Sequence, residues 1–96
     1  MSNKRYSRAT ADKQIKAGPG VIHSVTIAPT TATPTAGLLT IYDSLTETGN
    51  ILYSEWVFAT APGHGLNLEG ATCDTGIYVG FDGTLANVSC TVVYSD

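Results

Sequence analysis

The sequence predicts an all-β protein: a small antiparallel β-sandwich, jelly-roll-like, with an extended N-terminal arm. Three observations support this prediction. Short segments rich in β-branched and aromatic residues alternate between apolar and polar positions, as half-buried strands do. Clusters of Pro, Gly, Asn and Asp separate these segments about every 8–14 residues, which is typical of sandwiches and barrels. All five basic residues of the 96-residue chain lie in its first 16 positions, where apolar residues are few.

Residues 1–17 are predicted to form a basic arm, and residues 18–96 a single β-sandwich domain. The segment NKRYSRATADKQIK (3–16) contains every Lys and Arg of the chain and only one acidic residue, Asp12. The other seven acidic residues follow it, so the formal net charge of −3 is unevenly distributed. This asymmetry indicates an interaction arm. We expect the arm to be flexible in the free protein and ordered on binding.

The first half of the domain contains two predicted strands. The alternation in VIHSVTIA (21–28) places Val25 and Ile27 on one face and Ile22 on the other. A Pro- and Thr-rich loop follows, because proline cannot donate to a strand ladder. LLTIYD (38–43) is the next strand, and a turn containing a Gly-Asn pair ends it.

The second half of the domain contains four further segments of strand character. In the first of them, ILYSEWVFA, the side chains of Leu52, Trp56 and Phe58 share the predicted core face. The later segments place alternate Leu, Ile, Val and Cys side chains inward. The four predicted strands are 51–59, 66–70, 76–82 and 87–95.

No pair of residues in the sequence indicates a catalytic site, so we expect a protein that is not an enzyme and has no cofactor. His23 lies in a strand among apolar residues and is expected to be structural, and His64 lies in a Gly-flanked turn. Cys73 and Cys90 lack metal-ligand spacing. They are expected to be small buried hydrophobes, with a bridge between adjacent strands as the alternative.

Three acidic residues lie near the predicted turn at 44–50, and they raise the alternative of a cation site. Asp43, Glu47 and Glu55 do not follow the dense spacing of a calcium loop. Asp43 is therefore expected to cap this turn by accepting backbone N–H bonds, and the two glutamates to be solvated. We expect no bound metal.

The partner of the arm is expected to be an acidic protein surface. Phosphate attraction would have to work against the acidic domain, and the arm offers one aromatic residue, so we expect no nucleic-acid partner. No apolar run is long enough to span a membrane and none follows the basic N-terminus, so we expect no membrane partner and no secretory signal. The predicted partner-binding residues are Lys4, Arg5, Tyr6, Arg8, Lys13 and Lys16.

Five segments together resemble small tailed-bacteriophage virion proteins of the capsid decoration or cement type. They are GVIHSVTI (20–27), GLLTIYDS (37–44), TGNILYS (48–54), GIYVGFDG (76–83) and VSCTVVY (88–94). The resemblance covers about residues 18–95.

This resemblance implies a virion structural protein, made in the host cytoplasm and located on the capsid surface. Such a protein binds the outer surface of the major capsid lattice and stabilises it, and we expect a homotrimer whose partners are the major capsid protein and itself. The alternative is a component of the head–tail junction or of a tail appendage, with a glycan-binding module as one form of it.

Overall fold

The structure, a computed structural model, describes residues 4–59, 63–82 and 84–96, without the side chains of His64 and Glu69. It contains eight strands, and the described ranges contain no helix. These ranges therefore contain no helix that is long and apolar enough to cross a membrane. The strands are β1 (Arg5–Ala9), β2 (Lys13–Ala17), β3 (Gly20–Pro29), β4 (Gly37–Asp43), β5 (Asn50–Val57), β6 (His64–Cys73), β7 (Gly76–Asp82) and β8 (Val88–Ser95).

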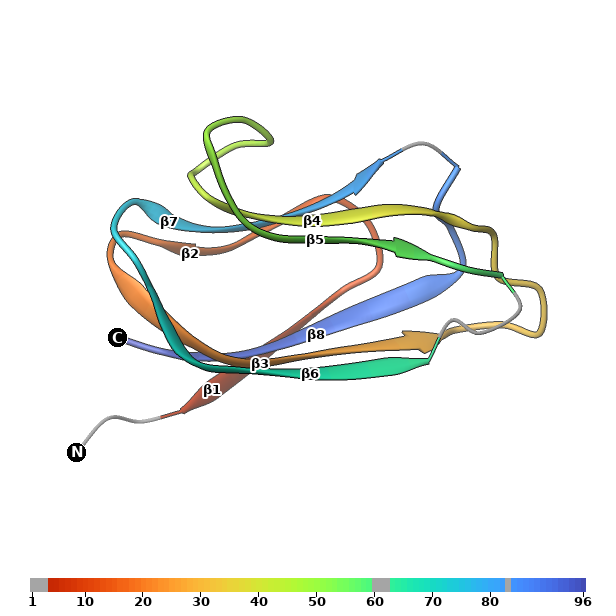
Figure 1. Cartoon of the computed structure of the whole chain (residues 1–96), viewed down its shortest axis with the longest axis horizontal. Helices are drawn as coiled ribbons and strands as arrows, with labels where there is room; N and C mark the ends of the chain where they lie inside the picture. Colours follow the sequence, from red (N-terminus) through yellow and green to blue (C-terminus); the bar gives the residue numbers. More distant parts are fainter. Residues whose placement is uncertain (1–3, 60–62, 83) are drawn as a thin grey trace.

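Two four-stranded antiparallel sheets pack face to face, which confirms the predicted β-sandwich (Figure 1). One sheet has the order β1-β8-β3-β6 and the other β2-β7-β4-β5. Strand pairing is nested: β1 pairs with β8, β2 with β7, β3 with β6 and β4 with β5. The chain is thus one long hairpin rolled into two sheets, which is the topology of a jelly roll.

Most of the segment predicted as an arm is part of the sandwich, and this corrects the prediction. β1 pairs with β8 from Arg5 opposite Tyr94 to Ala9 opposite Cys90, and β2 pairs with β7 in the other sheet. Ala9 is buried and Ile15 packs against the core. An edge strand of a sandwich needs few apolar residues, because only one face and one side contact the protein. The polar composition of residues 5–17 is therefore compatible with two edge strands.

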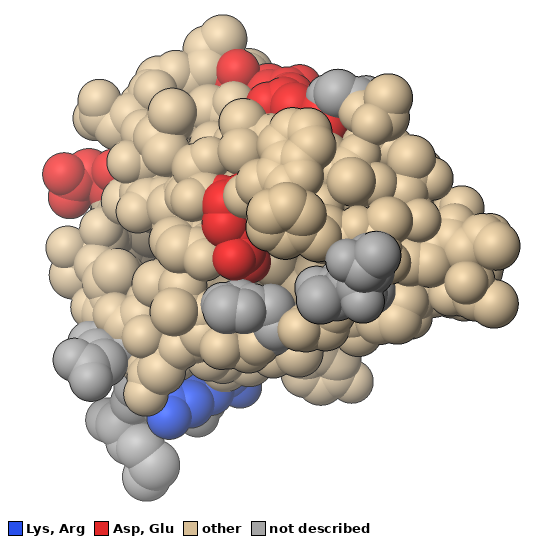
Figure 2. Space-filling model, turned by 45° about the vertical axis from the view of Figure 1, so that its right-hand side comes forward, with Lys and Arg blue, Asp and Glu red and all other residues tan. Residues whose placement is uncertain are grey.

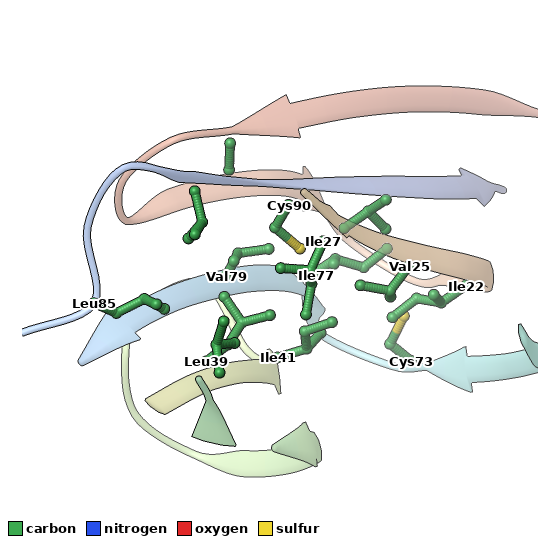
Figure 3. Close-up of a cluster of buried hydrophobic side chains, with 14 residues drawn as sticks. Ile22, Val25, Ile27, Leu39, Ile41, Cys73, Ile77, Val79, Leu85 and Cys90 are labelled. Carbon is green, nitrogen blue, oxygen red and sulfur yellow. The ribbon is translucent and has the colours of Figure 1, made fainter. Parts of the chain in front are cut away.

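The core lies between the sheets and is formed mainly by aliphatic side chains (Figure 3). On β3 the register shifts between Ile22 and Ser24, so Ile22 faces the core together with Val25 and Ile27. The simple alternation predicted for this strand is wrong at that point, because a bulge reverses the facing of the residues that follow it. Residues that are at most 2 % exposed include Ile22, Val25, Ile27, Leu39, Ile41, Ile77, Val79, Val88, Cys90 and Val92.

The predicted core face of β5 is wrong for two of its three residues. Trp56 and Phe58 are 51 % and 59 % exposed, whereas Val57 is buried and Tyr53 packs against the core. The cause is a register shift against β4, which leaves Leu52 as an extra residue between two paired positions. Leu52 itself is partly buried against the core, as predicted.

Asp43 fixes the turn between β6 and β7. Its Oδ1 accepts hydrogen bonds from the backbone N–H groups of Thr75 at 2.8 Å and Gly76 at 3.2 Å, and its Oδ2 accepts one from Asp74 at 3.0 Å. The backbone donors of Asp74 and Thr75 hold the pKa of this carboxyl below its ordinary value. The prediction that Asp43 accepts backbone N–H bonds is confirmed, but the turn predicted for it, at residues 44–50, is wrong: the donors belong to the β6–β7 turn, 31 to 33 residues away in sequence.

We expect Asp43→Asn to lower the free energy of unfolding by about 2 kcal/mol at neutral pH, because several charge-assisted hydrogen bonds are weakened. The folded pKa of Asp43 is lower than its unfolded value of 3.8. Its contribution is therefore complete above that value and is lost as the pH falls through the folded pKa. Urea unfolding from neutral to acid pH measures this difference. Asp74→Asn, at an exposed carboxyl in the same turn, is the matched control; equal losses in both variants would contradict the assignment.

Deleting residues 1–16 should abolish cooperative folding, because it removes β1 and most of β2 and uncovers the edges of both β8 and β7. Thermal melting followed by near-ultraviolet circular dichroism measures this effect. The variant Arg8→Glu/Lys13→Glu keeps both strands and should melt like the original protein. A deletion variant with the original melting transition would show that the segment is a dispensable arm.

Candidate functional site

All five basic residues lie along one edge of the sandwich. Only residues 10–12 connect β1 to β2, so these two edge strands of different sheets lie on the same side of the molecule. Figure 2 shows the visible Lys and Arg atoms gathered at the bottom of one view, apart from the Asp and Glu atoms at its top, left and middle. We call the surface formed by Lys4, Arg5, Arg8, Lys13 and Lys16 the basic edge.

Two residues of the basic edge are tied to the end of β8 through Asp96. Arg5 Nη2 lies 3.2 Å from Asp96 Oδ2, and Lys16 Nζ lies 3.0 Å from Asp96 Oδ1. The hydrogen bond from Lys16 and the nearby charge of Arg5 lower the pKa of Asp96. The Lys16 side chain crosses Gly20, where an added Cβ would meet its Cδ and Cε at 2.8 Å. Lys16 is only 16 % exposed, so it acts mainly within the protein.

The other residues predicted to bind a partner remain available at the surface. Arg8 and Lys13 are exposed, and in the part of the chain that the structure describes neither forms an ion pair. Lys13 Nζ donates to the Arg8 carbonyl oxygen at 3.3 Å, which keeps the two cations close together. Lys4 is exposed, and Tyr6 is 77 % exposed on β1. The structure thus brings the six predicted residues to one edge. Arg5 and Lys16 form ion pairs with Asp96, whereas the other four side chains are exposed to a partner.

Three carboxyl groups meet on the outer face of the sheet that contains β2, β7, β4 and β5. Glu47, from the loop above β4 in Figure 1, lies over Gly80 of β7, where an added Cβ would be 3.3 Å from its Cγ. Hydrogen bonds with Asp82 and Asp12 raise the pKa of Glu47 to about 7. Asp12 Oδ1 also accepts from the Phe81 N–H at 2.7 Å. These contacts fasten the loop and the β1–β2 connection to the sheet.

The acidic residues considered as a cation site do not come together. Asp43 is engaged by the β6–β7 turn, Glu47 by Asp82 and Asp12, and Glu55 by Tyr53 on β5. Burial and the hydrogen bond with Glu55 raise the pKa of Tyr53 to about 12. Among the described residues there is no group of His, Cys, Asp and Glu side chains able to hold a metal ion.

The histidine and cysteine side chains that the structure describes have structural contacts. His23 Nε2 lies 2.8 Å from Ser95 Oγ, but Ser95 is only 1 % exposed and its hydroxyl cannot meet a substrate. His64 begins β6, and its side chain lies outside the described part. Cys73 and Cys90 are free and buried, as expected, and desolvation raises the pKa of Cys90 to about 12. Such thiols are poor nucleophiles.

A second surface of interest was missed by the sequence analysis. Ile51, Trp56 and Phe58 are all more than half exposed on or beside the edge strand β5. We call these three residues the apolar patch. Ile51 and Trp56 share the outward face of β5, since Tyr53 and Val57 face the core, and exposed apolar side chains on one face are candidates for an interaction surface. The only sign of this in the sequence was that Tyr53 and Val57 form a second apolar face of the strand, as suitable for the core as the face that carries Trp56. A one-residue bulge turns this second face inward.

An open hollow lies where the β1–β2 connection meets the chain between β7 and β8. It has a volume of about 530 Å³ and is lined in part by Asp12, Phe81, Leu85 and Asn87. Asn87 adopts φ 60° and donates its side-chain amide to the Thr33 carbonyl oxygen at 3.0 Å. The hollow therefore combines a ring, an aliphatic side chain and two polar groups.

Comparison of the chain with protein-family models and with curated proteins gave no match. The basic edge, the apolar patch and the hollow are therefore the features of the molecule that bear on its function.

We expect Glu47→Gln to raise the melting temperature above pH 7 relative to the original protein, and to have little effect near pH 4.5. In the folded protein the pKa of Glu47 is about 7, so its carboxyl keeps a proton up to that pH. In the unfolded chain the pKa of Glu47 is 4.5. The contribution of protonated Glu47 to the free energy of unfolding is therefore complete below pH 4.5 and is lost as the pH rises through 7. Thermal melting across this range measures the difference. In an Asp82→Asn background the effect should shrink, because one of the two carboxyl partners of Glu47 has lost its charge while Asp12 remains; an undiminished effect would contradict the coupling.

Proposed function

We propose that this chain is a virion structural protein of a bacteriophage, a capsid decoration or cement protein that binds the outer surface of the major capsid lattice and stabilises it. The observation that supports this most is the concentration of every basic side chain on one edge of an otherwise acidic domain. Arg8 and Lys13 on this edge are exposed and close together. Such a charge distribution steers association with an acidic protein surface.

A protein surface suits this edge better than a nucleic acid. Seven acidic residues follow the basic segment, and their charge weakens the attraction of a phosphate backbone that approaches from a distance. Tyr6 is the only aromatic residue of β1 and β2, so the edge lacks the row of rings on which bases stack. The partner is therefore expected to be an acidic patch of a capsid subunit or of a sister subunit.

The basic edge is rigid, and this favours binding. Both of its strands are hydrogen-bonded into sheets, so their ordering cost is met when the protein folds rather than when it binds. A protein that binds only the mature lattice stabilises that lattice by linkage. Many copies on one shell act multivalently, so a modest affinity for each site is enough.

A second candidate is a glycan-binding module of a tail appendage or of the head–tail junction. The hollow beside Phe81 favours it, since a sugar ring stacks on an aromatic face and its hydroxyls bind carboxylate and amide groups such as those of Asp12 and Asn87. Jelly rolls occur in both viral capsid and lectin domains. The two candidates differ in their response to salt, because a sugar is uncharged while the basic edge depends on charge.

Co-sedimentation with mature shells of a phage that encodes the chain tests the proposal. We expect the full chain to pellet with shells in about 0.1 M salt and to be released in about 1 M salt, over which the Debye length falls from about 10 Å to about 3 Å. Arg8→Glu/Lys13→Glu should weaken binding at least about tenfold, as expected for reversing two charges at a charged contact. Shells that carry the protein should also melt at a higher temperature than bare shells.

The matched control places two acidic residues off the basic edge, at the exposed positions of Thr26→Glu/Thr31→Glu, and should still bind. Binding that salt and the Arg8→Glu/Lys13→Glu variant both leave unchanged would refute the role of the basic edge. Absence of binding at any salt concentration would refute the decoration role and favour the glycan-binding candidate.

A further inference from the structure

We propose that the loop between β4 and β5, residues 44–49, is a pH-sensitive strap: it lies closed over the outer face of the β2-β7-β4-β5 sheet while the Glu47 carboxyl is protonated, and it lifts when that carboxyl ionises. We call this loop the strap. None of its residues belongs to the basic edge, so the strap is independent of the proposed capsid role. The motion is local, because the strap lifts while the two sheets stay folded.

The strap is exposed along most of its length. Residues 45, 46, 48 and 49 are exposed, and Figure 1 shows the loop standing above β4 and β7. Within the strap, the Thr46 N–H donates to Ser44 Oγ at 3.2 Å, and the hydroxyl oxygens of Thr46 and Thr48 lie 2.8 Å apart. These bonds shape the strap without attaching it to the sheet. Exposed loops of this kind open at a low cost in free energy.

Two side chains of the strap pack on glycines of β7. Leu45 Cδ2 lies 3.1 Å from the position that a Cβ would take at Gly76, but Leu45 is 46 % exposed. Glu47 Cγ and Oε1 both lie 3.3 Å from the corresponding position at Gly80. A side chain at position 80 would take the space in which Glu47 lies, so this glycine allows the carboxyl to reach the sheet.

Glu47 faces carboxyl groups from two other segments. It forms hydrogen bonds with Asp82 of β7 and with Asp12 of the β1–β2 connection. A hydrogen bond between two carboxyl groups needs a proton on one of them, because ionised carboxylates only accept. Lys13, beside Asp12 in the sequence, donates instead to a carbonyl oxygen of β1, and the ion pairs of the described residues do not involve these three carboxyls. The cluster is therefore joined by a proton and, without it, holds three like charges.

The titratable groups next to the three carboxyls are two tyrosines, and these stay neutral. Burial, and then the charges of the nearby carboxylates, raise the pKa of Tyr42 of β4 and of Tyr78 of β7 above the ordinary value of 10.0. The two histidines belong to β3 and β6 of the opposite sheet. Between about pH 5 and pH 9, the groups beside the strap that change charge are therefore the carboxyls.

Ionisation of the cluster moves the strap rather than the sheet. The hydrogen bonds with Asp82 and Asp12 raise the pKa of Glu47 to about 7, so its proton is lost above that pH. Asp82 belongs to β7, and Asp12 is fixed by the Phe81 N–H, which donates to its Oδ1 at 2.7 Å. Glu47 lies on an exposed loop. The repulsion is therefore relieved by displacing Glu47 from its place over Gly80.

The closed strap covers a tyrosine on the outer face of the sheet. Leu39 and Ile41 of β4 point into the core, so Tyr42 points outward, yet it is only 9 % exposed. Its ring lies 6.4 Å from the ring of Tyr78, at an angle of 60°. Tyr42 Cε1 lies 3.1 Å from the Cβ position at Gly80, next to the carboxyl of the strap. Lifting the strap therefore brings the Tyr42 ring into contact with water.

Nuclear magnetic resonance of the full chain between about pH 5 and pH 9 tests this proposal. We expect the ring signals of Tyr42 and the amide signals of the strap to change together with a midpoint near pH 7, while the amides of the core residues Val25 and Val92 stay constant. Above the midpoint, the strap amides should exchange with solvent at least about tenfold faster, relative to their intrinsic rates, than below it.

Two variants identify the titrating group. Glu47→Gln keeps a hydrogen-bond donor but cannot ionise, so it should hold the strap closed and remove the transition. Asp82→Asn should lower the pH of the midpoint, because one like charge beside Glu47 is gone. Asp74→Asn changes an exposed carboxyl outside the cluster and is the matched control, in which the transition should be unchanged.

The absence of a transition in the original chain would overturn the proposal. A transition that persists in Glu47→Gln would also overturn it, because another group would then be titrating. The same holds if the core amides lose their protection at the pH at which the strap changes, since the whole sandwich rather than the strap would then be opening.

Discussion

The structure depends on one constraint: residues 5–17 must supply an edge strand to each of the two sheets. The chain passes from one sheet to the other within residues 10–12, so β1 and β2 are held on the same side of the sandwich. This crossing brings the N-terminal residues against the last strands, and the ion pairs of Arg5 and Lys16 with Asp96 lie where the two ends of the chain meet. The location of the basic edge is therefore a consequence of the nested pairing.

The sequence was sufficient to predict the sandwich because six of its strands carry a repeated pattern. From β3 to β8, β-branched residues alternate with polar ones and turn residues interrupt them, and each predicted strand corresponds to an observed one. The pattern fails for β1 and β2, whose apolar anchors are essentially Ala9 and Ile15. In such segments the pairing partner decides the structure, and the partner cannot be seen from local composition.

The same limit explains why the apolar patch was misplaced. A one-residue bulge at Leu52 exchanges the two faces of β5, so Val57 becomes buried and Trp56 exposed. Either face of this strand carries enough apolar residues to serve as the core face. Of the candidate site, the sequence could predict which residues are basic and that they gather near one another. It could not predict that Asp96 would occupy Arg5 and Lys16, because that contact joins positions 91 and 80 residues apart.

The charges of this molecule are therefore best understood as a property of its edges. A jelly roll has two open edges, and each exposes unpaired backbone groups that invite further strands. In this chain the basic side chains lie along one of these edges, and a cation there discourages pairing with an identical edge. Since the strands that carry these cations are fixed by hydrogen bonds, the selectivity is present before any partner arrives. A flexible arm with the same five residues would attract the same partners, but it would pay the ordering entropy on binding and could not impose a strand register.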